Sequence, residues 1–236
     1  MVSLSESPHS HYWSFCFLGV GSLMPWNAFI TVSEYFQSRL CGTAYEKTFE
    51  SAFGLSYNLV SLIFFLVMVK FQHIFSDKLL VLGSSSLLFA TFLLTTAIVL
   101  FPMGNEGIFF MFSVLSISAS GALCGPYLTG LCRFAARIAP IYASAIFTGQ
   151  AVSGVIVSLV SFLTISLSPM KDNFCDGVNY SLNNDRVEDN CHSFTVDWSA
   201  FVYFSIVTIS MFLCGILYLR LERFLLSKNG NYYIKM

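Results

Sequence analysis

Long runs of apolar residues, free of Asp, Glu, Lys, Arg and His, dominate the pattern along this chain. A helix of about 20 apolar residues is long enough to cross the hydrocarbon core of a bilayer. Six runs reach or approach this length, and they predict six transmembrane helices. Allowing for helix ends, the expected spans are residues 12–35, 50–70, 79–102, 108–134, 139–167 and 198–221.

The composition agrees with this pattern. Of the 236 residues, 56% are hydrophobic and 11% are charged, whereas about 25% of residues are charged in a typical soluble domain. So few charges cannot cover so much apolar surface in water. We therefore predict an all-α polytopic membrane protein in which residues 1–236 form one six-helix bundle. The formal net charge of −1 excludes the basic field that binding to nucleic acid requires.

Lys and Arg are unevenly distributed between the two sides of the predicted bundle. Eight of the 12 fall on the side of both termini, at Lys70, Lys78, Arg133, Arg137, Arg220, Arg223, Lys228 and Lys235. The other four are Arg39, Lys47, Lys171 and Arg186. Because cytosolic loops carry the excess of positive charge, both termini are expected to be cytosolic. The pattern is compatible with the plasma membrane and with an endolysosomal or vacuolar membrane.

The longest polar connection, residues 168–197, faces the cell exterior or a lumen in this orientation. It contains the sequence Asn-Tyr-Ser at Asn179, a predicted N-glycosylation site. Cys175 and Cys191 lie in the same loop, and in an oxidising compartment they could form a disulfide. That pairing would leave Cys41 without a partner.

The sequence offers no catalytic constellation. There are no paired carboxylates deep in a span, and no HExxH, GxSxG or CxxC motif occurs. Intramembrane hydrolysis needs a nucleophile with a base, or a metal with its ligands. The sequence therefore predicts neither an enzyme, nor a cofactor, nor a metal site.

Polar residues inside the spans are rare and have two interpretations. Asn27, Asn58 and Gln150 could form interhelical hydrogen bonds, or they could contact a polar solute in a central cavity. Trp26 lies too deep in its run for an interfacial residue and could stack on a planar solute. Pro25 removes a backbone hydrogen bond and is suited to a kink or gate.

Small residues and two arginines complete the candidates. Gly149 and Gly154, in the fifth span, are expected to allow close helix packing. We expect structural or gating roles for them, as for Asn27 and Gln150. Arg133 and Arg137 lie one turn apart at the end of the fourth span, where snorkelling side chains would anchor the helix.

Three blocks of sequence resemble one transporter family. Residues 19–31 read Gly-Val-Gly-Ser-Leu-Met-Pro-Trp-Asn-Ala-Phe-Ile-Thr, similar to the first-span signature of equilibrative nucleoside transporters. Residues 140–142, Pro-Ile-Tyr, and 148–154, Thr-Gly-Gln-Ala-Val-Ser-Gly, resemble the family's passage from span four to span five. Residues 219–224, followed by two tyrosines at 232–233, resemble the exit of span six.

The resemblance implies a fold and a function. The family has six spans in an N-terminal bundle and five in a C-terminal bundle, arranged like the major facilitator fold. It moves nucleosides, and in some members nucleobases, down their gradients by alternating access. Carried over by position, the residues that face the solute are Leu23, Trp26, Ile30, Asn58 and Ser61, with position 128 as a sixth.

This chain departs from the family at three points. Leu128 stands where the family commonly has a solute-binding Gln, and Leu cannot hydrogen-bond a base. Arg133 stands at a position that is Gly in the family. No counterpart of the C-terminal bundle is present, although alternating access requires two units that rock around one site. We therefore expect a fragment or half-transporter, and no saturable uridine or adenosine uptake by vesicles containing only this chain. Uptake that Trp26→Ala abolishes would contradict this expectation.

Two alternatives remain open from the sequence. The chain could pair with a full-length relative or a second copy and regulate it without transporting. It could also carry nucleobases or organic cations, since Leu128 alters the solute site. The absence of Asp, Glu and His from the apolar runs favours facilitated diffusion over proton coupling.

Overall fold

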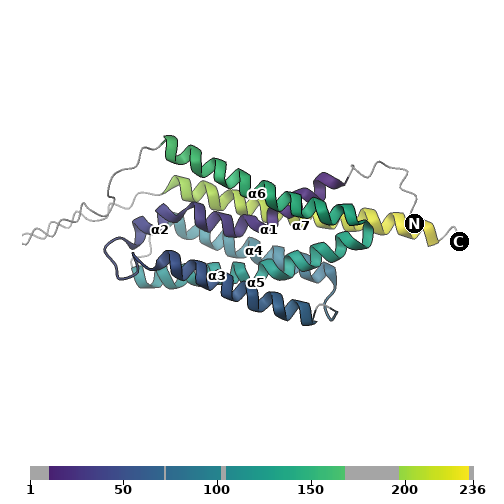
Figure 1. The fold of residues 1–236 in the computed structure, drawn as a ribbon, viewed down its shortest axis with the longest axis horizontal. Helices are drawn as coiled ribbons and strands as arrows, with labels where there is room; N and C mark the ends of the chain where they lie inside the picture. The colour runs from purple at the N-terminus through teal and green to yellow at the C-terminus, as the bar shows by residue number, and fades with distance from the viewer. Residues whose placement is uncertain (1–10, 72, 102–104, 168–196, 234–236) are drawn as a thin grey trace, which may run out of the picture.

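A computed structural model describes residues 11–71, 73–101, 105–167 and 197–233 of the protein. Within these ranges the chain is helical, with short connections and no strand. Figure 1 shows the helices lying lengthwise beside one another, with α3 and α5 along one side of the bundle. The helices are α1 (Tyr12–Thr31), α2 (Ser33–Leu40), α3 (Phe49–Phe71), α4 (Asp77–Leu100), α5 (Glu106–Ile138), α6 (Pro140–Leu167) and α7 (Trp198–Tyr233).

Six stretches of the described helices are long and apolar enough to cross a membrane. The first covers α1 and α2 together, over Tyr12–Leu40, and each later helix provides one more. This confirms the predicted all-α polytopic membrane fold. That these helices correspond to the N-terminal bundle of a larger transporter stays a prediction.

The first span is interrupted at Val32. Its backbone (φ −96°, ψ 25°) leaves the helical region between α1 and α2, while its N–H still donates to the carbonyl of Ala28 at 3.2 Å. Pro25, by contrast, lies buried inside α1, which continues as a helix to Thr31. The helix therefore breaks at Val32, and a kink or gate at Pro25 stays a prediction.

Local sequence signals fix where the later helices begin. The Ser76 hydroxyl accepts a hydrogen bond from Leu79 N–H at 3.2 Å and caps α4, and the Asn105 side chain does the same for α5. Pro140 opens α6, at the helical position where its missing N–H costs nothing. It follows Ala139, whose extended backbone ends α5.

Two apolar clusters form the core, one toward each end of the bundle. The first is rich in phenylalanine and joins α1, α2, α3, α4, α5 and α7. Phe29, Phe36 and Phe204 belong to it, with ring centroids 5.6–6.4 Å apart. The second surrounds Tyr127 and Tyr218, which are almost fully buried. Aromatic pairs at these distances are favourable beyond their buried area.

The closest helix contact joins α1 and α6 through two glycines. A Cβ atom on Gly19 would overlap the backbone carbonyl of Ile146, and one on Gly149 would overlap the carbonyl of Cys16. The two backbones therefore touch directly, as small residues allow between membrane helices. Asn27 adds a polar link, since its Nδ2 donates to the Ser153 hydroxyl at 3.0 Å.

Other glycines differ in what they face. A Cβ on Gly121 would lie 2.7 Å from the carbonyl oxygen of Tyr57, so α5 and α3 also approach closely. Gly154, in contrast, has no heavy atom within 4 Å of its Cβ position. Close packing among the described residues therefore explains the glycine at 149 and does not explain the one at 154.

A network of ion pairs connects α4 and α5. Asp77, at the start of α4, is buried, and its two carboxylate oxygens lie 3.0 Å from Nε of Arg133 and 2.9 Å from Nη1 of Arg137. Arg133 also donates to the backbone carbonyl of Phe75 at 3.3 Å. The two arginines are thus more than snorkelling anchors, because one turn of α5 presents both to the same carboxylate.

Replacement of the two α6 glycines should separate packing from helix propensity. Gly149→Ala is expected to destabilise the chain by roughly 1–3 kcal/mol, the usual cost of overpacking, because the new methyl group overlaps the Cys16 backbone. Gly154→Ala is the matched control and should be neutral or stabilising, since Ala favours helix and the space is open. Melting of purified protein in detergent measures both; equal melting temperatures for Gly149→Ala and the unsubstituted chain would contradict the α1–α6 contact.

The charge network yields a second expectation. Asp77→Asn leaves two arginines without their shared carboxylate, and breaking a fully buried ion pair costs roughly 3–5 kcal/mol. The loss should be smaller here because the Arg137 side chain is 66% exposed. Lys78→Ala is the control, since it breaks the pair with Glu222 from the side of the lysine, whose side chain is 56% exposed. Ion pairs at the surface are worth about 0–1 kcal/mol. Urea titration of the two variants with equal midpoints would contradict this ranking.

Candidate functional site

A groove of about 340 Å³ lies among α1, α3, α5 and α6. Its volume falls in the range of small-molecule sites, roughly 300–1,000 Å³. The residues that line it are Ser22, Leu23, Tyr57, Asn58, Ser61, Leu62, Phe65, Cys124, Gly125, Leu128 and Gln150.

The groove lies midway along the helices that form it. On α1, its residues Ser22 and Leu23 fall between Phe15 of one apolar cluster and Phe29 of the other. On α5, the lining residues Cys124 and Gly125 likewise fall between Ile117 of one cluster and Tyr127 of the other. Solute sites of transporters lie near the bilayer midplane, and this depth suits such a site.

The structure brings together five of the residues singled out from the sequence. Leu23, Asn58, Ser61 and Leu128, expected to face a solute, line the groove together with Gln150, expected to have a structural or gating role. They come from four helices that are far apart in the sequence, so tertiary packing alone assembles them. Their contact with a solute stays a prediction.

Trp26 and Ile30 lie outside the groove lining. The indole of Trp26 stacks on the ring of Tyr57, with centroids 4.3 Å apart and planes 26° apart. Tyr57 is itself a lining residue, so Trp26 contacts the groove wall through this ring. Ile30 is one turn further along α1 and half exposed. The expected packing of Trp26 on a base is not visible in this arrangement and stays a prediction.

The three polar residues with two interpretations behave differently. Asn27 forms the interhelical hydrogen bond to Ser153 described above and does not line the groove. Asn58 lines the groove, and its Nδ2 donates to the carbonyl of Gly54 on its own helix at 2.7 Å. Gln150 does both, since it lines the groove and its Nε2 donates to the Ser22 hydroxyl at 2.8 Å.

Sequence reasoning missed several groove residues, of which Tyr57 and Phe65 are the largest. A signal for them existed on α3, where positions 57, 58, 61, 62 and 65 share one face at helical spacing. Asn58 and Ser61 are polar, and they distinguish that face of α3 from its apolar faces. No comparable signal existed for Ser22 or Cys124, which lie among other small residues.

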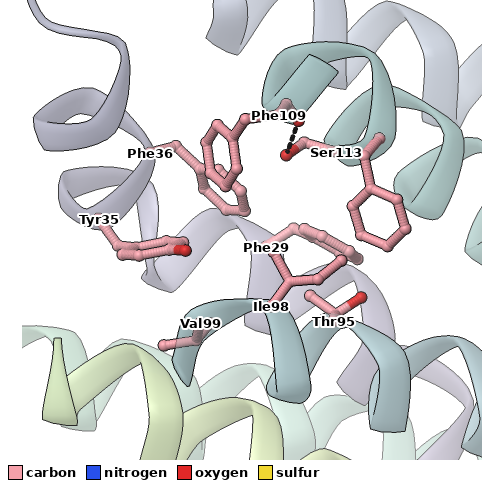
Figure 2. A pocket seen from close by; sticks show the side chains of 9 residues that line it. Phe29, Tyr35, Phe36, Thr95, Ile98, Val99, Phe109 and Ser113 are labelled. Carbon is pink, nitrogen blue, oxygen red and sulfur yellow. Dashed lines mark hydrogen bonds between the residues drawn. The ribbon is translucent and has the colours of Figure 1, made fainter. Parts of the chain in front are cut away.

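A second cavity, in the phenylalanine-rich cluster, is too small for a solute. Figure 2 shows Phe29, Phe36 and Phe109 around it, with Thr95 and Ser113 at its edge. Its volume is about 10 Å³, close to the space of one water molecule. The hydroxyls of Thr95 and Ser113 donate to carbonyls of their own helices, at 2.9 and 2.8 Å.

The cysteine predictions meet one correction. Cys41, expected to be left without a partner, is disulfide-bonded. The four described cysteines within the spans are free: Cys16, Cys124, Cys132 and Cys214. The predicted pairing of Cys175 with Cys191 and the predicted glycosylation of Asn179 lie outside the described residues.

The chemistry of the groove suits a neutral, partly apolar solute. Its wall combines apolar and aromatic side chains with two carboxamides and two aliphatic hydroxyls, from Asn58, Gln150, Ser22 and Ser61. No residue in this lining is Asp, Glu, Lys, Arg or His. A charged solute would lack a counter-charge here, and an unpaired charge is costly away from water.

Comparison with known proteins identifies relatives along most of the chain. No family model matches it. It is 30% identical over 218 residues to equilibrative nucleotide transporter 1 of Arabidopsis thaliana, which covers 91% of this chain and 43% of the relative. It is 28% identical over 200 residues to equilibrative nucleoside transporter 1 of Rattus norvegicus, covering 70% and 43%.

A third relative, equilibrative nucleoside transporter 2 of Mus musculus, is 26% identical over 167 residues, covering 65% of this chain and 36% of the relative. The chain thus spans less than half the length of the curated relatives that it matches. The plant relative is named a nucleotide transporter and the two mammalian relatives are named nucleoside transporters, all of them equilibrative. The six apolar helices of the described residues agree with membrane proteins of this kind. The chain belongs to the equilibrative nucleoside transporter family.

Proposed function

We propose that this chain forms one wall of the pathway of a facilitative nucleoside transporter, and that the groove is the part of that wall that contacts the nucleoside. The observation that carries the proposal is the groove itself, in which residues of four helices place carboxamides, hydroxyls and aromatic rings around one space. The names of the two mammalian relatives supply the solute class. The plant relative is named for nucleotides, whose charged phosphates would lack a counter-charge in this lining.

A nucleoside matches the groove by charge and by shape. The molecule is neutral, with a planar base and a ribose that carries hydroxyl groups. Tyr57 and Phe65 offer rings against which a base can pack, and stacking of a base on an aromatic side chain contributes about 1–3 kcal/mol. The carboxamides of Asn58 and Gln150 can exchange hydrogen bonds with base or sugar. The uncharged lining disfavours an organic cation.

Facilitated diffusion is the form of transport that the groove supports. Proton-coupled carriers keep a titratable carboxylate or imidazole in the membrane. The lining has neither, and the buried carboxylate of Asp77 is engaged with Arg133 and Arg137 at the end of α4. We therefore propose that the nucleoside moves down its own gradient.

The groove is open on the side of α3. Asn58 and Leu62 line it and are exposed, so a solute bound there would still be uncovered on one side. Alternating access requires a second unit facing the site. We propose that a second transmembrane bundle covers the groove. The relatives are more than twice as long as the region that matches this chain, which leaves room for such a bundle in them.

We further propose that both termini are cytosolic. The charge distribution supports this orientation, and so does Cys41, because disulfides persist on the oxidising side of a membrane. Cys41 follows α2 directly and lies at the end of the first span that this orientation places outside.

Cysteine labelling tests the solute site. Asn58→Cys, in purified chain in lipid nanodiscs, is expected to react with a small polar maleimide, and millimolar uridine or adenosine should slow this reaction at least threefold. Lys47→Cys, in the connection between α2 and α3, is the matched control that nucleoside should not protect. The unsubstituted chain, whose native Cys124 also lines the groove, gives the background rate.

The outcomes are distinct. If nucleosides fail to slow labelling at Asn58→Cys, the groove is not a nucleoside site. If a nucleobase or a monoamine protects and nucleosides do not, the solute class is wrong. The orientation is read from the same Lys47→Cys variant in intact cells, where an impermeant maleimide should label it from outside; labelling only after permeabilisation would reverse the orientation.

A further inference from the structure

The carboxamide of Gln150 is held by a chain of two hydrogen bonds that crosses the closest helix contact. Its Nε2 donates to the Ser22 hydroxyl oxygen at 2.8 Å, and the Ser22 hydroxyl donates to the carbonyl of Gly19 at 2.7 Å. Ser22 is 3% exposed, so water does not compete for its oxygen. Gly19 touches the backbone of Ile146 on α6, so the carbonyl that accepts the second hydrogen bond is held in place by the contact between the two helices.

These two hydrogen bonds fix the orientation of the Gln150 carboxamide. A serine hydroxyl has one proton, and here that proton is used on Gly19. Ser22 can therefore only accept from Gln150, so the amide nitrogen must point toward α1. The amide oxygen and one N–H then remain for a further partner. Gln150 lines the groove, so these two groups are available to a molecule in the groove.

No other carboxamide in the groove lining has this combination. The Asn58 amide is also in the lining, but its bond goes to Gly54 on its own helix. Asn27 is fixed to a serine across α1 and α6, but it does not line the groove. Leu128 lines the groove and cannot form a hydrogen bond. Gln150 is thus the lining carboxamide whose orientation a second helix fixes.

We infer that Gln150 determines base specificity by reading a base edge that carries one donor beside one acceptor, and that Ser22 is its positioning residue. The inference rests on the proposed function. A carboxamide pairs with such an edge through two hydrogen bonds, as Gln does with the amino group and ring nitrogen of adenine. A base that lacks the amino group leaves the amide oxygen of Gln150 without its partner, which is costly in a partly buried site.

Binding of adenosine and of purine riboside, which lacks the 6-amino group, tests the inference. In the unsubstituted chain in lipid nanodiscs, calorimetric titration should show that adenosine binds about tenfold more tightly than purine riboside. A difference of this size is expected when a carboxamide pairs with a base through two hydrogen bonds. In Gln150→Leu the two affinities should become equal within twofold. Purine riboside should lose less affinity than adenosine, because the variant costs it only the bond to the ring nitrogen, whereas adenosine loses that bond and the one from its amino group.

The role of Ser22 is tested by the ratio of the affinities for adenosine and for purine riboside. Ser22→Ala keeps the Gln150 carboxamide and releases its orientation, so the preference for adenosine should fall severalfold. Ser22→Thr retains a hydroxyl and should restore it. These two variants also carry the test if Gln150→Leu does not fold, since an unchanged ratio in Ser22→Ala would then overturn the inference.

The control is Asn27→Leu, which removes the other carboxamide–serine bond between α1 and α6. It should lower the melting temperature about as much as Gln150→Leu and leave the ratio of affinities unchanged. If both variants change the ratio alike, the effect is structural and the inference fails. If nucleosides bind but the ratio of affinities does not change in Gln150→Leu, the inference is wrong and the proposed function stands. If no nucleoside binds at all, both the inference and the proposed function are wrong.

Discussion

The direct contact of the α1 and α6 backbones is the constraint on which the groove depends. Lipid tails are as apolar as leucine, so membrane helices associate by close packing and by interhelical hydrogen bonds. Gly19 and Gly149 permit that packing, since a Cβ on either would overlap a backbone carbonyl of the facing helix. The same approach brings Gln150 within hydrogen-bond distance of Ser22, and so it decides which polar atoms reach the groove.

The two ends of the bundle are held by different forces. At the end that we assign to the exterior, phenylalanine rings of several helices interlock around Phe29 and Phe36. At the other end, two arginines of α5 share the buried carboxylate of Asp77. The groove lies between these ends and is lined by smaller and more polar side chains.

Sequence patterns predicted the groove better than its individual contacts. Asn58, Ser61 and Leu128 were singled out and do line it, whereas Trp26 is outside the lining and stacks on the lining residue Tyr57. Asn27 and Gln150 looked equivalent in the sequence, and only one of them faces the groove. An amide bonded between two helices has the same sequence signature whether or not a cavity adjoins it, so periodicity alone could not separate them.

The sequence by itself determined that the chain crosses the membrane as a set of helices, because each apolar run must satisfy its own backbone hydrogen bonds in lipid. It also determined the starts of helices at Ser76 and Pro140, where local capping and backbone restraint act within one turn. Tertiary structure alone decided that Arg133 and Arg137 meet Asp77, and that residues of four helices form one groove. Those contacts join residues far apart in the sequence, and they form only when the helices pack.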